Sequence, residues 1–103
     1  MIIIYSISKT PIRLTNERWE HIIFRHPELS EEKEKVLDTL TNPEFVQEGD
    51  FETLFAIKHY AKTPLTSKYM VVVYKETSAA DGFILTAYFT NHPSEQRKIL
   101  WKP

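Results

Sequence analysis

The sequence contains no cysteine, so disulfide bonds, thiolate zinc sites, iron–sulfur clusters and a cysteine nucleophile are all excluded. It has only two glycines, which leaves no glycine-rich loop for binding a phosphate. No apolar run approaches the roughly 20 residues of a membrane-spanning helix. The N-terminal residues also lack the basic start and the cleavage site of a signal peptide. We therefore expect a cytoplasmic protein with no membrane partner.

Enough apolar and aromatic residues are present to build one hydrophobic core. The chain has 103 residues, of which 42% are hydrophobic and 13% aromatic. That length is typical of one domain, and the composition is too apolar for a disordered chain. We expect a single domain over residues 1–103, with its core at about 14–90 and a C-terminal tail at 91–103.

Charge is unevenly distributed, although the net charge is only −1. Residues 31–52 carry a net charge of −6, and residues 53–103 carry +4. A polyanion could bind the basic second half, or a basic partner could bind the acidic middle. Alternatively, the acidic residues at 31–38 are only the solvated face of a helix.

Two helices are predicted in the first half of the chain, after a short strand at 2–7. Thr15 or Asn16 can cap the first helix, and His26 ends it because a residue before proline avoids the helical region. Ser30 is expected to cap the second helix, which ends at Asn42–Pro43.

Alternating sequences then predict four strands, at about 45–48, 52–60, 69–76 and 83–90, with a hairpin turn signalled by Asp81–Gly82. Helices followed by consecutive strands are typical of the α+β class. We expect the N-terminal helices to pack on one face of a four-stranded antiparallel sheet.

The alternation also assigns side chains to the two faces of that sheet. The expected helix-facing residues are Phe55, Ile57, Val71, Val73, Phe83, Leu85, Ala87 and Phe89. The expected open face is rich in hydroxyl and phenol groups and contains Lys58, Tyr60, Tyr74, Thr86, Tyr88 and Thr90. Solvated antiparallel faces are commonly rich in Thr and Tyr, so this face fits a plain surface as well as a site.

The first helix carries a basic strip at the border between core and solvent. Arg18, His21 and Arg25 fall within a sector of about 60°, at 100° per residue. His26 lies at the helix end, where the partial negative charge of the helix favours the imidazolium form and burial beside Trp19 would disfavour it. Each histidine could equally be a boundary residue with a structural role.

Metal ligation is not predicted by this pattern. A helical zinc pair needs histidines four residues apart, whereas His21 and His26 are five apart and diverge by about 140°. We therefore expect neither a metal nor a cofactor. Imidazole, guanidinium, ammonium, hydroxyl and phenol groups suit cleavage of RNA by its own 2′-hydroxyl, which needs proton transfer and cations around the phosphate.

The segment Leu14–Leu29 (LTNERWEHIIFRHPEL) resembles the helical signature of small phage and bacterial nucleases of the barnase–EndoU–colicin–RelE-like group. Asn42–Pro43 before a strand, and Phe83–Thr90 (FILTAYFT) as the last strand, are similar in order and character. The resemblance covers about residues 14–90. It implies a single nuclease-like domain and a metal-independent endoribonuclease, often a toxin paired with an antitoxin or immunity protein.

Position by position, the resemblance places His21, Arg25 and His26 in the site, together with Thr86 and Tyr88 of the last strand. Lys58 is added as a catalytic candidate because it is expected on the open face of the sheet. Arg18 and Tyr60 are added as candidates for binding the RNA substrate, for which tRNA is one candidate. The alternative from another class is a non-catalytic protein-interaction module on the same fold.

Overall fold

The computed structural model describes residues 1–66 and 68–103. These residues form a sheet of seven strands, two α-helices and a short 3-10 helix, which confirms the α+β class. In chain order the elements are β1 (Ile2–Tyr5), β2 (Pro11–Leu14), α1 (Asn16–Arg25), η1 (Pro27–Leu29), α2 (Lys33–Thr41), β3 (Phe45–Glu48), β4 (Leu54–His59), β5 (Tyr69–Ser78), β6 (Asp81–Thr90) and β7 (Ile99–Trp101).

The sheet is larger than predicted, and it is mixed. Its strand order is β1-β2-β6-β5-β4-β3-β7, in which β2 and β6 run parallel and the other neighbours antiparallel. The prediction of a four-stranded antiparallel sheet is therefore wrong. The four predicted strands form its centre, and three- or four-residue strands extend both edges. Strand β2 begins at Pro11, since proline is tolerated as the first residue of a strand.

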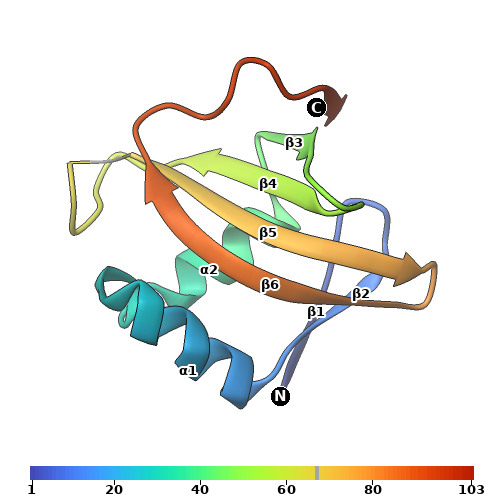
Figure 1. Ribbon diagram of the computed structural model, residues 1–103, viewed down its shortest axis with the longest axis horizontal. Helices are drawn as coiled ribbons and strands as arrows, with labels where there is room; N and C mark the ends of the chain where they lie inside the picture. Colours follow the sequence, from blue (N-terminus) through green and yellow to red (C-terminus); the bar gives the residue numbers. More distant parts are fainter. Residues whose placement is uncertain (67) are drawn as a thin grey trace.

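Both helices cover one face of the sheet, and the C-terminal segment crosses the other face (Figure 1). Thr15 caps α1 as predicted, since its side chain accepts a hydrogen bond from the Arg18 N–H at 3.0 Å. The helix ends before His26–Pro27, which was also predicted. Ser30 does not cap α2, because Pro27 starts η1 and delays the start of α2 to Lys33.

The main core lies between the helices and the sheet. The helices contribute Trp19, Ile22 and Leu40 to it. Their strand partners are the buried side chains Ala56, Met70, Val72, Tyr74, Ile84, Ala87 and Phe89. Ala87 and Phe89 therefore face the helices as predicted.

The predicted face assignment is wrong for β4, β5 and part of β6. Phe55, Ile57, Val71, Val73 and Leu85 form a second apolar cluster on the face away from the helices. In β5 the run Met70–Tyr74 is buried at every position, so the sequence pattern does not indicate which of these side chains face the helices. In β6 the register shifts opposite Val73 and Tyr74, which places Ile84 rather than Leu85 under the helices. Phe83, also expected there, is half-buried and lies outside the helix-facing cluster.

Gly82 has a packing role instead of the predicted turn role. The β5–β6 hairpin exists, but Ser78 pairs with Asp81, so its turn is formed by residues 79–80. A Cβ on Gly82 would lie 2.5 Å from the Lys75 carbonyl oxygen and 2.6 Å from Ile12 Cδ1. Glycine therefore allows β2 to approach β6.

Among the described residues, no helix has the length and apolar character needed to cross a membrane.

Candidate active site

The C-terminal half of β6 presents an edge to α1. Strand β2 pairs with β6 only at Ile12–Gly82 and Arg13–Phe83, and α1 follows β2 almost immediately along the chain. The helix therefore continues beside the edge that β2 leaves unpaired (Figure 1). Arg18 Nη1 donates a hydrogen bond of 3.4 Å to the Leu85 carbonyl oxygen on this edge.

His26 and Tyr88 meet at the end of this contact. Their ring centroids lie 6.2 Å apart, with the ring planes inclined by 32°. The backbone N–H of His26 donates to the Ile22 carbonyl oxygen at 2.8 Å, which makes this residue the C-cap of α1. Its Nδ1 lies 3.7 Å from Glu28 Oε2. The structure thus brings together two of the predicted catalytic residues.

Tyr88 is half-buried, and its environment keeps the phenol protonated. Burial raises the pKa of Tyr88 above its ordinary value of 10.0, although the nearby Arg97 guanidinium partly opposes that shift. At neutral pH the group is therefore a proton donor and not a base. Thr86 lies two residues earlier on the same face of β6, also half-buried, where it pairs with Val73.

The basic strip on α1 is exposed as predicted. Arg18, His21 and Arg25 are all accessible to solvent. Within the described residues, neither Arg18 nor Arg25 forms an ion pair with a carboxylate. Arg18 lines two hollows of about 310 and 300 Å³ beside the helix N-terminus, and His21 lines the larger of them. These cations are therefore available to a phosphate backbone.

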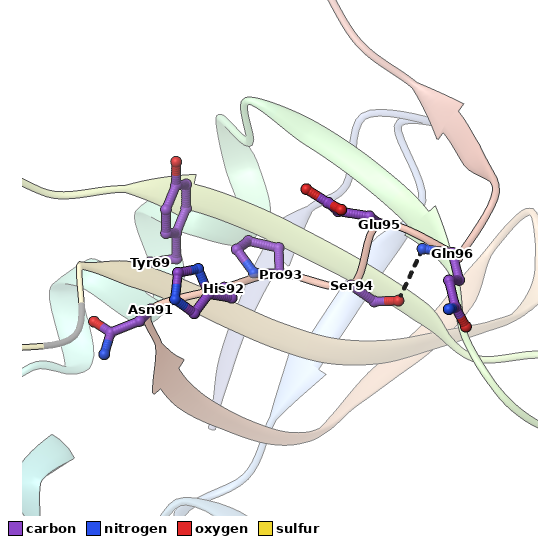
Figure 2. A pocket seen from close by; sticks show the side chains of 7 residues that line it. All are labelled: Tyr69, Asn91, His92, Pro93, Ser94, Glu95 and Gln96. Atoms are coloured by element: carbon purple, nitrogen blue, oxygen red, sulfur yellow. Dashed lines mark hydrogen bonds between the residues drawn. The ribbon is translucent and has the colours of Figure 1, made fainter.

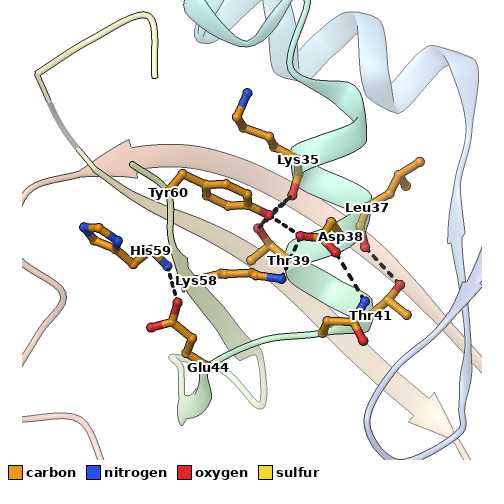
Figure 3. Close-up of polar contacts among 10 residues, drawn as sticks. Lys35, Leu37, Asp38, Thr39, Thr41, Glu44, Lys58, His59 and Tyr60 are labelled. Carbon is orange, nitrogen blue, oxygen red and sulfur yellow. Dashed lines mark hydrogen bonds and ion pairs between the residues drawn. The ribbon is translucent and has the colours of Figure 1, made fainter. Parts of the chain in front are cut away.

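Lys58 and Tyr60 lie apart from this site, on the helix-facing side of the sheet. Both converge on Asp38 of α2, as Figure 3 shows: Lys58 Nζ lies 2.8 Å and the Tyr60 hydroxyl 2.7 Å from Asp38 Oδ2. Tyr60 also hydrogen-bonds Thr39 and the Lys35 carbonyl oxygen, each at 3.1 Å. The expectation that they share a face with Tyr88 is wrong, because the side chains of β4 point to the opposite faces from those predicted. Their contacts fasten α2 to β4.

Asp38→Asn should lower the free energy of unfolding by about 1 kcal/mol at pH 7, a value discounted for the 40% exposure of the Asp38 side chain. Burial raises the pKa of Asp38, but hydrogen bonds from Lys58, Tyr60 and Asn42 outweigh it, so the net pKa is lowered from 3.8. A lowered folded-state pKa stabilises the fold above pH 3.8, and this contribution is lost as the pH falls through the folded value. Urea unfolding of both proteins at pH 7 and pH 3 should show a difference that shrinks in acid. An equal difference at both pH values would contradict this role.

The tail adds residues that the sequence did not identify as part of a site. His92 and Arg97, both in the predicted C-terminal tail, line a hollow with Tyr88 on the face away from the helices. Arg97 is held by Asp50 through two contacts of 3.2 and 3.1 Å. The tail ends in β7, which pairs with β3 through Trp101 and Ile99. The apolar run Ile99–Trp101 is the signal in the sequence that this segment docks.

Among the described residues, no group of three or more His, Cys, Asp or Glu side chains is arranged to hold a metal ion. No protein-family model, curated protein or solved structure matches this chain. The case for a function therefore depends on the site itself.

Proposed function

We propose that the protein is an endoribonuclease of the toxin type, which cleaves RNA by attack of a 2′-hydroxyl on the neighbouring phosphate. The observation that carries this proposal is the meeting of His26 and Tyr88 beside a helix whose arginines have no acidic partner among the described residues. An imidazole, a protonated phenol and free cations are the groups that this reaction requires.

In the proposed reaction, His26 accepts the proton of the 2′-hydroxyl as the oxygen attacks phosphorus. The bond between phosphorus and the 5′-oxygen breaks, and Tyr88 donates its proton to that leaving oxygen. An alkoxide is more basic than a phenolate, so the proton moves downhill. Arg18, His21 and Arg25 would bind the RNA backbone along α1. The extra proton on His26 then passes through water to the Tyr88 phenolate, which restores the neutral imidazole and the phenol.

Purified protein incubated with total RNA and with defined tRNAs, with and without EDTA, tests the proposal. We expect RNA cleavage at equal rates in both conditions and no cleavage of DNA, which lacks the 2′-hydroxyl. Activity that requires a divalent metal would overturn the mechanism. Inactivity on every RNA would favour the alternative of a protein-interaction module, for which an antitoxin or immunity protein is the expected partner.

A further inference from the structure

The C-terminal segment borders the hollow that Tyr88, His92 and Arg97 line on the face of the sheet away from the helices. This hollow has a volume of about 340 Å³ and is lined by Gln47, Phe55, Ile57, Val71, Tyr88, Thr90, His92, Pro93, Ser94 and Arg97. A neighbouring hollow lies along the same segment, with Tyr69 and His92 at one end and Gln96 at the other (Figure 2). Tyr88 is thus shared between the first of these hollows and the candidate active site.

Gln47 is the unusual member of this lining. Its side chain is almost completely buried, with only 2% of its surface exposed. The amide Nε2 donates a hydrogen bond of 2.6 Å to the Ser94 carbonyl oxygen, which fixes the side chain beneath the C-terminal segment. The amide oxygen Oε1 has no hydrogen-bond partner among the described residues. A buried acceptor without a donor is unfavourable, so this oxygen favours a ligand that supplies an N–H group.

The remaining lining mixes apolar side chains with polar ones, and its charge is balanced. Phe55, Ile57 and Val71 belong to the apolar cluster of this face. The Arg97 guanidinium stacks 4.5 Å from the centre of the Phe55 ring, and its charge is matched by Asp50. Such a pocket disfavours a bare anion. It suits a planar heteroaromatic group with an N–H edge, because guanidinium and aromatic groups line it and Gln47 Oε1 lacks a donor among the described residues.

We propose that this hollow binds a nucleobase of the RNA, namely the base of a nucleotide adjoining the cleaved phosphate. The inference rests on the proposed function, since Tyr88 then contacts the base on one side and the reacting phosphate on the other. Gln47 is assigned as a specificity-determining residue that makes cleavage depend on the identity of that base.

Titration of the four nucleoside 3′-monophosphates, followed by calorimetry and by the NMR signals of the Gln47 side-chain amide, tests this pocket. We expect at least one nucleotide to shift those signals and to bind more tightly than the other three. Gln47→Leu should weaken its binding at least tenfold. Gln96→Leu is the matched control, because Gln96 is exposed on the C-terminal segment and does not line this hollow, and it should bind as the wild type does.

Thermal melting of each variant shows whether it is folded, and Gln47→Met, which keeps an unbranched side chain, replaces Gln47→Leu where that variant does not fold. No shift of the Gln47 signals with any nucleotide, or equal affinity in the Gln47 variants, would overturn the pocket. RNA cleavage without base preference would also overturn it while leaving the nuclease proposal intact. Selective nucleotide binding at Gln47 in a protein that cleaves no RNA would support the pocket and overturn the nuclease.

Discussion

His26→Ala and Tyr88→Phe should each slow RNA cleavage by roughly 10²–10⁴-fold, which is the usual contribution of a positioned acid or base. His26 lies at the solvent border and Tyr88→Phe keeps the ring, so neither change should greatly alter the melting temperature. Single-turnover cleavage rates across pH provide the measurement. The two losses should not add in the double variant, because the residues act on one phosphate.

Matched control variants separate a loss of catalysis from a general loss of folded structure. His59→Ala removes a histidine that lies against Tyr69 at a different part of the sheet, and Tyr5→Phe removes a phenol from the exposed edge strand β1. Both should retain wild-type rates. His21→Ala should be compared with His26→Ala, since His21 lies on the strip expected to contact the backbone. A full loss in His21→Ala with a normal rate in His26→Ala would transfer the base role to His21.

Phe89→Ala should lower the free energy of unfolding by roughly 3–5 kcal/mol. Phe89 is only 8% exposed and packs in the helix-facing core, so the truncation leaves a cavity beneath the helices. Urea unfolding measures the loss. Phe51→Ala is the control, because Phe51 is 92% exposed, and it should change stability by less than about 0.5 kcal/mol. A loss below 1 kcal/mol for Phe89→Ala would contradict its place in the core.

Local signals in the sequence were sufficient for both ends of α1, the end of α2 and the central strands. Thr15 and the His26–Pro27 pair act within one helical turn, so their effect does not depend on the rest of the fold. The short strand predicted at 2–7 is present as β1, whereas β2 and β7, of four and three residues, were not predicted. Their pairing depends on partners distant in the sequence.

The faces of the sheet could not be read from alternation alone. Met70–Tyr74 is apolar throughout because helices cover one side and a second apolar cluster covers the other. The register shift in β6 then moves Leu85 to the far face, and no residue type in Phe83–Thr90 marks that shift. These two features explain why Lys58 and Tyr60 were expected beside Tyr88 but pair with Asp38 instead.

The helical half of the candidate site was predictable, since the spacing of Arg18, His21 and Arg25 defines one helix face. The meeting of His26 with Tyr88 was expected from the resemblance, but its geometry depends on β2 ending early and leaving the edge of β6 to α1. The contribution of Gln47 and Arg97 was not predictable. Both lie near Tyr88 only because the C-terminal segment folds back over the sheet.

The chemistry of the RNA ends tests the central claim most directly. Attack by the 2′-hydroxyl leaves a 2′,3′-cyclic phosphate on one product and a 5′-hydroxyl on the other. Mass spectrometry of the fragments from a defined tRNA should therefore find these two ends, in EDTA as well as without it, and no cleavage at the same position by His26→Ala beyond about 1% of the wild-type rate. Fragments with a 5′-phosphate would show that an outside nucleophile attacks the phosphate, which would contradict the assignment of His26 and Tyr88.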